Sequence, residues 1–209
     1  MKNETPIYAI DFEGSKSLGI VEFGIAEILR GKVSKVYTAI CAPKRAISPK
    51  DAKFFGISNE FAKTFAPFEA HCELFCDLRS RGIFAAHNHS TEDTLLRSHI
   101  PSPGRVKNFF TAMDTLAWAP WLDSRNFAKF LKPDLKSEKL SECIRELNLQ
   151  DRLKESAERF CDSSRAAWHR ALFDALASAE IISAALEKLS DFSELKKFAP
   201  GANQGEIFL

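Results

Sequence analysis

The chain has 209 residues, of which 45% are hydrophobic and 18 are phenylalanine, and its formal net charge at neutral pH is +1. This length and composition favour one domain with a large core and exclude a disordered chain or a small disulfide-stapled scaffold. A net charge near zero gives no global basic or acidic field, so a highly charged partner would have to be held by a local site. No apolar run approaches the length of a membrane span and the first residues show no secretory pattern, so we expect a cytoplasmic protein.

The first third of the chain shows strand patterns. Three apolar runs are separated by turn residues, and they cover Ile7–Phe12, Ile20–Leu29 and Lys35–Ala42. They predict an antiparallel meander. Ser48 before Pro49 is typical of the start of a short helix.

Helix and strand patterns alternate in the middle of the chain. A helix is expected over 68–81 and ends at Gly82, after which Ile83–Ala86 is a short, wholly apolar run typical of a strand buried on both faces. A further helix is expected near Thr91–His99, and Phe109–Asp114 predicts one more buried strand.

The remainder is mainly helical, with segments near Ser137–Leu147, Gln150–Phe160 and Ala166–Leu189. Early strands and late helices predict an α/β fold with a mixed five-stranded sheet, in which an antiparallel meander is joined by parallel strands and covered by helices. We expect one domain over residues 1–198 and a short flexible tail over 199–209.

Five cysteines form an odd set without a CxxC pair, which favours reduced thiols over disulfides: Cys41, Cys72, Cys76, Cys143 and Cys161. His71, Cys72 and Cys76 resemble half of a zinc site, but no second half follows. The favoured interpretation is that they belong to the amphipathic helix.

Asp11 and Glu13 stand two residues apart at the end of the first strand pattern, so both side chains point to the same face. Two such carboxylates repel each other unless a cation separates them, and hard ions such as Mg²⁺ or Mn²⁺ prefer oxygen ligands. Alone, the pair is weak evidence, because most Asp-x-Glu pairs are solvated strand ends.

Polar residues begin directly after Ile83–Ala86, and ligands of open α/β sheets collect at the carboxyl ends of strands. Glu92 shares a helical face with Leu95 and Leu96, so it would point inward, whereas Asp93 would point about 100° away. The alternative is an acidic first turn favoured by the helix dipole.

Asp174 is a lone acid in an apolar helical run, and a buried carboxylate needs a partner such as a metal ion. His169 lies five residues earlier, about 140° away on a continuous helix, so we expect it on the preceding loop or first turn. From there it could reach a metal-bound water, although a histidine with a purely structural role is the alternative.

In this order and spacing, three segments resemble the motifs of the DnaQ-like, DEDDh exonuclease family: Asp11-Phe12-Glu13, Ala86-His87-Asn88 leading to an acid, and His169-x4-Asp174. The resemblance runs over about 7–182 of the chain. Other stretches that follow the family's outline are Ile20–Ala26, Phe55-Gly56-Ile57-Ser58, Asp114-Thr115-Leu116-Ala117 and Lys139–Cys143.

The resemblance implies a ribonuclease-H-like fold and a 3′→5′ exonuclease that releases nucleoside 5′-monophosphates. In the family, four acids bind two divalent ions, Mg²⁺ or Mn²⁺, at the scissile phosphate, and a histidine is the general base. Carried over to this chain, the catalytic residues are His169 and Glu13, and the metal ligands are Asp11, Glu13, Glu92 and Asp174. The implied substrate contacts come from Phe12, Gly14, His87 and Asn88.

Two positions depart from the family's pattern. The third acid usually follows an aromatic residue and is an aspartate, whereas this chain has Thr91-Glu92, with Asp93 one residue later. We assign Glu92, because it stays in phase with the leucines, and Asp93 remains the alternative. After Glu13 the family often carries threonines, but this chain has Gly14 and Ser15.

The last residues, Gln204-Gly205-Glu206-Ile207-Phe208-Leu209, resemble the short peptide with which many bacterial replication and repair proteins bind the sliding clamp. In this interpretation Gln204, Ile207 and Phe208 contact the clamp, and a flexible tail becomes ordered on binding. The alternative is that the apolar end folds back on the core.

The leading prediction is therefore a metal-dependent exonuclease acting on DNA 3′ ends in proofreading or repair. An RNA exonuclease of the same family is the first alternative, because discrimination depends on contacts with the 2′-hydroxyl. The second alternative is a non-catalytic module that binds nucleic-acid ends or the clamp.

Overall fold

The computed structural model describes residues 4–111 and 113–200. Its strands are β1 (Ile7–Ser15), β2 (Gly19–Leu29), β3 (Lys32–Ile40), β4 (Ile83–Ala86), β5 (Val106–Lys107), β6 (Asp114–Thr115) and β7 (Trp121–Asp123). Its α-helices are α1 (Pro49–Phe55), α2 (Asn59–Ala62), α3 (Cys72–Arg81), α4 (His89–Arg97), α5 (Ser124–Leu131), α6 (Leu140–Glu146), α7 (Gln150–Phe160) and α8 (Ala171–Leu186). Three 3-10 helices are η1 (Phe68–His71), η2 (Ser163–Arg165) and η3 (Phe192–Phe198).

Five strands form one mixed sheet in the order β3-β2-β1-β4-β7. β1, β2 and β3 pair antiparallel as a meander, while β4 pairs parallel to β1 and β7 parallel to β4. Both parallel connections run through helices, as expected for parallel strands. The predicted α/β fold with a mixed five-stranded sheet is confirmed.

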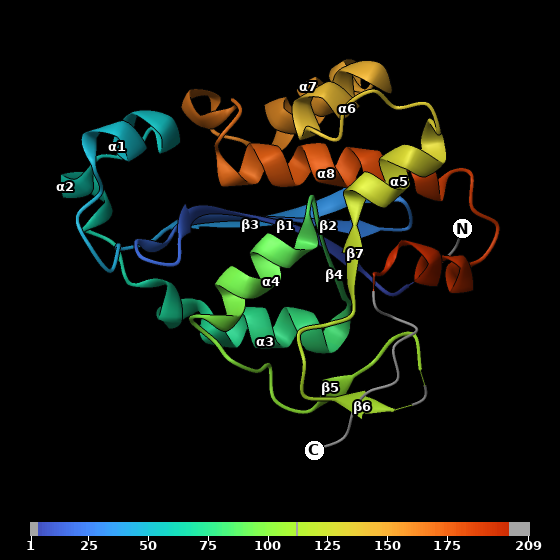
Figure 1. Ribbon diagram of the computed structural model, residues 1–209, viewed down its shortest axis with the longest axis horizontal. Coiled ribbons are helices and arrows are strands. Elements are labelled where there is room, and N and C mark those ends of the chain that lie inside the picture. Colours follow the sequence, from blue (N-terminus) through green and yellow to red (C-terminus); the bar gives the residue numbers. More distant parts are fainter. Residues whose placement is uncertain (1–3, 112, 201–209) are drawn as a thin grey trace.

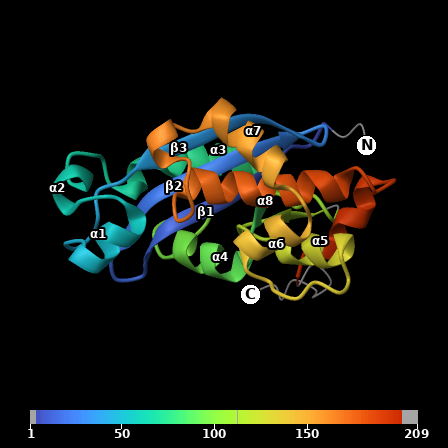
Figure 2. The ribbon, with the colours of Figure 1, turned by 90° about the horizontal axis from the view of Figure 1, so that it is seen from above.

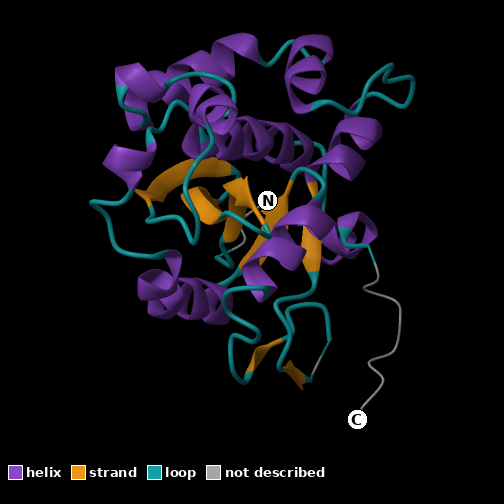
Figure 3. Ribbon diagram, turned by 60° about the vertical axis from the view of Figure 1, so that its left-hand side comes forward, coloured by secondary structure: helices purple, strands orange, loops and turns teal. Residues whose placement is uncertain are grey.

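The sheet lies between two helical layers (Figures 1 and 3). α8 crosses one face of the sheet, with α5, α6 and α7 outside it, and α3 and α4 cover the other face (Figures 1 and 2). Alternate residues of β1 face opposite sides of the sheet. Ile7 and Ala9 pack on the α8 side, while Tyr8, Ile10 and Phe12 join the aromatic cluster of the other side. Asp11 and Glu13 continue the first set toward α8.

One strand prediction is wrong. Phe109 and Phe110 lie in a turn between β5 and β6, which form a separate two-stranded ribbon, and the fifth strand of the main sheet is β7. The side chain of Arg79, fully buried, holds this excursion by donating to the carbonyls of Lys107, Trp118 and Ala119. The apolar run therefore resembles a buried strand, although Phe109 and Phe110 are turn residues that pack, half-buried, against the core.

The predicted helices differ from the observed ones mainly in where they begin and end. The helix expected over 68–81 begins with the 3-10 turn η1, and the one expected from Ala166 starts only at Ala171. α5 was not predicted. No helix within the described ranges is long and apolar enough to cross a membrane.

Candidate active site

The α8 face of β1 carries the first two acids, and a glycine on the neighbouring strand lets α8 approach them. Asp11 is paired with Gly24 of β2. A Cβ atom on Gly24 would lie 2.2 Å from the backbone nitrogen of Leu172, so only glycine permits this contact between strand and helix. The first turn of α8 therefore rests directly on the sheet beside Asp11.

Asp174 projects from that first turn and is buried. Its Oδ2 accepts a hydrogen bond from the backbone N–H of His169 at 3.1 Å, which fixes the loop before α8. Its Oδ1 is buried and accepts no hydrogen bond from any described residue. A buried carboxylate oxygen without a partner is energetically costly and indicates a ligand.

Glu92 projects from the first turn of α4, which begins directly after β4. Leu95 and Leu96 are buried on the same helical face, and Glu92 is buried with them. Its Oε2 also lacks a partner among the described residues. Asp93 instead accepts a hydrogen bond from the indole N–H of Trp121 at 3.0 Å and lies 3.7 Å from Arg97.

The four acids form one electrostatic cluster. Burial raises the pKa of Asp11 well above its usual range, and the charges of Asp174, Glu92 and Glu13 raise it further. Burial, reinforced by neighbouring carboxylates, likewise raises the pKa of Glu13 to about 8, of Glu92 to about 8 and of Asp174 to about 7. The four acids therefore lack enough neighbouring positive charge to balance them.

The donor set fits hard divalent cations. Carboxylate oxygens are the ligands that Mg²⁺ and Mn²⁺ prefer, and two of these oxygens are buried and unpartnered. Ligand atoms of Glu13, His169 and Asp174 also lie within 4.8 Å of one another. Within the described ranges this is the group of three that could hold an ion, and the cysteines of the zinc-like segment do not join such a group.

His169 occupies the loop before α8, as its spacing from Asp174 predicts. Its backbone is in the left-handed region, with φ of 62°, and its side chain is exposed. The imidazole lies against the Phe54 ring of α1, with ring centres 4.1 Å apart. Arg170 donates to the carbonyls of Phe54 and His169, which ties the loop to α1.

A buried ion pair that sequence reasoning missed supports this loop from below. Glu22 of β2 is 3% exposed and lies opposite Glu13 in the sheet. Arg165 donates to both oxygens of Glu22, at 2.9 and 2.7 Å, and Ala171 donates its N–H at 3.2 Å. The pair neutralises a fifth acid next to the cluster. Nothing in the local sequence links positions that are 143 residues apart.

The side chains expected to contact substrate are mostly engaged within the protein. Phe12 packs edge-on against Phe68 on the other face of the sheet. Both ring nitrogens of His87 have partners, the Ser124 hydroxyl at 2.7 Å and the Glu138 carbonyl at 2.6 Å. The structure therefore does not bring these two side chains to the carboxylates.

Gly14 and Asn88, the other two expected substrate contacts, both have a positive φ angle. Gly14 has φ of 146° at a bulge directly after Glu13, where a Cβ atom would lie 2.1 Å from the carbonyl oxygen of Gly19. Asn88 is left-handed at the start of α4, and its amide donates to the Thr91 hydroxyl. Both residues shape the segments that carry Glu13 and Glu92.

Asp123 lies at the end of β7 and binds the residues around it. The sequence pattern instead indicates Asp114-Thr115 at the end of this last strand of the sheet. Asp123 is buried and accepts hydrogen bonds from His89 at 3.0 Å and from Arg125 at 2.9 Å. Although burial alone would raise its pKa, these hydrogen bonds hold the pKa well below its usual range. Asp123-Ser124 thus takes the position at the strand end, and Asp114-Thr115 lies in the outer ribbon.

Comparisons with known proteins agree with this architecture. No family model matches the chain. The PolC-type DNA polymerase III of Caldanaerobacter subterraneus subsp. tengcongensis is 26% identical over 194 residues, and that of Clostridium perfringens is 23% identical over 192. These alignments cover 91% and 90% of this chain but only 12% of either polymerase, so the chain spans about an eighth of the length of the curated relatives it matches.

Several solved structures share the fold of this chain. Exonuclease X in complex with 5′ overhanging duplex DNA matches with a TM-score of 0.63 and 18% identity, over 94% of this chain and 98% of that one. The nuclease domain of 3′hExo, a DEDDh family member bound to rAMP, matches with a TM-score of 0.61 and 15% identity, over 88% and 92%. Exonuclease I of E. coli in a complex with single-stranded DNA matches at 0.62 and 15%, over 94% and 43%.

The chain therefore has the mixed α/β fold of these solved exonuclease structures. These structural neighbours include a 3′-exonuclease and a DEDDh family member, and the resemblance noted in the sequence is confirmed at the level of the fold.

Proposed function

We propose that this chain is a metal-dependent 3′→5′ exonuclease that removes nucleoside 5′-monophosphates from DNA 3′ ends. One observation carries the proposal: four acids form one electrostatic cluster, two of their oxygens are buried without partners among the described residues, and the exposed His169 lies beside Glu13 and Asp174. The fold shared with 3′-exonucleases supports it. A role in proofreading or repair is part of the proposal, supported by the likeness to a segment of DNA polymerases.

Asp11, Glu13, Glu92 and Asp174 would hold two Mg²⁺ or Mn²⁺ ions. When bound, such ions neutralise charge at the scissile phosphate, lower the pKa of the attacking water and stabilise the leaving 3′ oxygen. The protein supplies a rigid frame, because Gly24 seats α8 on the sheet and Leu95 and Leu96 seat α4.

His169 would act as the general base. Its exposed ring is within reach of Glu13 and Asp174 and is braced by Phe54, so it can accept the proton of the attacking water and pass it to solvent. The hydrogen bond from its backbone N–H to Asp174 couples the position of the base to that of the metal ligand.

An RNA exonuclease is the second candidate. The neighbour 3′hExo is bound to rAMP, whereas Exonuclease X is bound to duplex DNA. The same carboxylates would serve either polymer, and contacts with the 2′-hydroxyl would decide between them.

A non-catalytic module that binds nucleic-acid ends is the third candidate. The clustered carboxylates, which lack compensating positive charge, and the histidine beside them argue against this candidate. A protein that only binds an anionic strand gains nothing from uncompensated negative charge at its binding site.

Digestion assays test the proposal directly. The protein is incubated with Mg²⁺ or Mn²⁺ and 5′-labelled single-stranded DNA or RNA, and stepwise shortening from the 3′ end is followed on gels. His169→Ala is expected to lower kcat by about 10²- to 10⁴-fold with folding retained. His71→Ala, on the other face of the sheet, is the matched histidine control. No stepwise digestion of either polymer would reject the enzymatic proposal.

The C-terminal tail is a separate part of the proposal. Gln204, Ile207 and Phe208 lie outside the described residues, so binding to a bacterial sliding clamp rests on the sequence pattern alone. The intact chain is expected to retain clamp in a pull-down, and a chain lacking residues 204–209 is expected to lose it. Equal retention by both chains would remove the tail from the proposal.

A further inference from the structure

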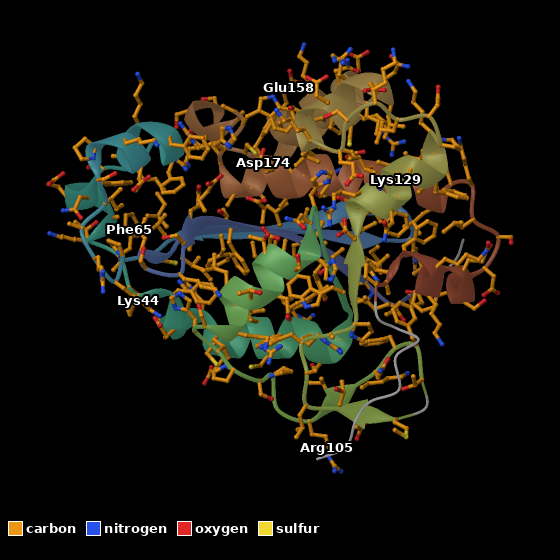
Figure 4. All side chains as sticks on the ribbon, viewed as in Figure 1. Lys44, Phe65, Arg105, Lys129, Glu158 and Asp174 are labelled. Atoms are coloured by element: carbon orange, nitrogen blue, oxygen red, sulfur yellow. The ribbon has the colours of Figure 1, made fainter. Side chains whose placement is uncertain are left out.

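The segment from Lys44 to Phe65 presents an unusual surface beside the candidate site. Three of its aromatic side chains are exposed although they are large and apolar: Phe54 is 50%, Phe61 51% and Phe65 38% exposed. We call this surface, with the exposed basic residues around it, the α1–α2 platform; its basic members are Lys44, Arg45, Lys50, Lys53 and Lys63. Figure 4 shows Phe65 and Lys44 at the α1–α2 end of the molecule and Asp174 on α8.

The exposed rings are not displaced core residues. Beneath them, a separate small core is already filled, by Leu18, Val21, Ile47, Phe55, Ile57 and Ala62. Phe61 and Phe65 pack edge-on against each other, with ring centres 5.0 Å apart, and keep their outer faces free for contact. Exposed apolar surface of this kind marks an interaction site.

The platform is joined rigidly to the candidate site. The Phe54 ring lies 4.1 Å from the His169 ring, and Arg170 donates to the Phe54 carbonyl at 2.9 Å. Arg165, held by Glu22, donates to the Phe55 carbonyl at 3.3 Å. A strand whose 3′ end lies at the carboxylates can therefore continue over the platform.

The charge of the platform suits an anionic chain. Five basic residues stand against two acids in this segment, Asp51 and Glu60, whereas the whole chain carries a net charge of only +1. Lys44 pairs with Glu69 at 3.4 Å. The other four basic side chains form no ion pair with a residue in the described part of the chain.

We propose that the α1–α2 platform binds the single-stranded segment that leads into the candidate site, with bases stacked on Phe61 and Phe65 and phosphates at Lys50, Lys53 and Lys63. The direction of the strand rests on the proposed exonuclease function. Stacking on aromatic rings accepts every base, and lysines follow the backbone without reading sequence. The substrate class is therefore single-stranded nucleic acid several nucleotides long, bound without base preference.

Binding without turnover tests the aromatic part. Anisotropy of a 5′-fluorescein-labelled strand of about 15 nucleotides, close to the longest site of a single-strand-binding fold, is measured with the intact chain in EDTA. Phe61→Ala with Phe65→Ala is expected to weaken binding by about 10-fold or more. Replacement of both by tryptophan is expected to keep it. Phe130→Ala, an exposed ring on α5, is the matched control, and thermal unfolding verifies that each variant folds.

The salt dependence of the same binding tests the basic part. Single strands give a slope in log Kd against log salt of about 0.7 per phosphate contact. Replacing Lys50, Lys53 and Lys63 by glutamine is therefore expected to reduce the slope by about 2. An unchanged slope would exclude these lysines from the path.

Substrate length separates this proposal from the proposed activity. If the chain digests DNA, the preference in kcat/KM for the long strand over a dinucleotide is expected to fall by about 10-fold in the double alanine variant. Digestion with unchanged length preference and unchanged binding would overturn the platform but not the activity. Ring-dependent binding without digestion would support the platform and reject the activity. Equal binding of a blunt duplex, or no strand binding at all, would also overturn the platform.

Discussion

Replacement of Glu92 by glutamine is expected to abolish metal-dependent digestion and, at the same time, to stabilise the protein in the absence of metal. Loss of one ligand removes several kcal/mol of transition-state stabilisation, which corresponds to a fall in kcat of about 10³-fold or more. In the metal-free protein, however, glutamine is permanently neutral at a site where burial and the charges of neighbouring acids oppose the ionisation of Glu92. Opposite effects on activity and stability distinguish a ligand from a merely structural acid.

Asp93→Asn is the matched control, because it changes the neighbouring acid on the same helical turn. Asp93 contacts Trp121 and Arg97, and asparagine can still accept the indole N–H. We expect nearly wild-type digestion and little change in unfolding. Loss of activity in Asp93→Asn with full activity in Glu92→Gln would reverse the assignment of the third acid.

The pH dependence of metal-free stability has the same origin. The folded-state pKa values of Glu13 and Glu92 are raised to about 8 and that of Asp174 to about 7, so the folded protein binds more protons than the unfolded chain between about pH 4 and 8. Stability is therefore fully present at the acidic end and falls as the pH rises to 8. A tenfold difference in proton affinity between the folded and unfolded states corresponds to about 1.4 kcal/mol, so urea unfolding in EDTA should lose about 3 kcal/mol or more between about pH 5 and 8.

Divalent ions are expected to reverse this trend. A ligand that binds only the folded state stabilises it by mass action, and it does so more strongly when its carboxylate ligands are ionised. Unfolding at about pH 8 with millimolar Mg²⁺ should then approach the stability seen at about pH 5. A metal-free stability that does not depend on pH in this window would contradict the clustering of the four acids. Glu92→Gln should flatten the dependence in EDTA.

The fold was predictable where the pattern of the local sequence decides the structure. The meander and β4 were found because their apolar runs are long, or wholly apolar, and end at turn residues. β7 was missed because its three residues follow Pro120 directly and give no periodic signal. Phe109–Asp114 misled because the two phenylalanines of a turn, packed against the core from outside, have the composition of a buried strand.

Some residues of the candidate site could likewise be predicted from local spacing, and others could not. Strand alternation brings Asp11 and Glu13 together, and helical phase distinguishes Glu92 from Asp93, so both arrangements follow from spacing. Residues that act through tertiary contacts carry no such signal. Gly24 matters because α8 approaches it, and a glycine in a strand pattern hints only at close packing. Glu22 resembles a polar residue of a half-buried strand until its partner Arg165 is known.

Arg165→Ala is expected to destabilise the protein by about 3–5 kcal/mol. The change leaves Glu22, which is 3% exposed, as an uncompensated buried charge next to four other acids. It also removes the hydrogen bonds that tie η2 to the carbonyls of Phe55 and Gly56. Urea unfolding at neutral pH measures the loss.

Two further variants show whether the buried charge is the cause. Arg165→Met combined with Glu22→Gln removes both charges and should recover most of the stability, because an unpaired charge no longer remains. Arg30→Ala breaks the exposed pair with Glu4, in which the guanidinium also donates two hydrogen bonds, and should cost less than about 1 kcal/mol. If Arg165→Ala cost no more than Arg30→Ala, the Glu22–Arg165 pair would not support the loop that carries His169. A large cost recovered in the double variant would identify Arg165 as the residue that allows a fifth acid to lie beside the four clustered acids.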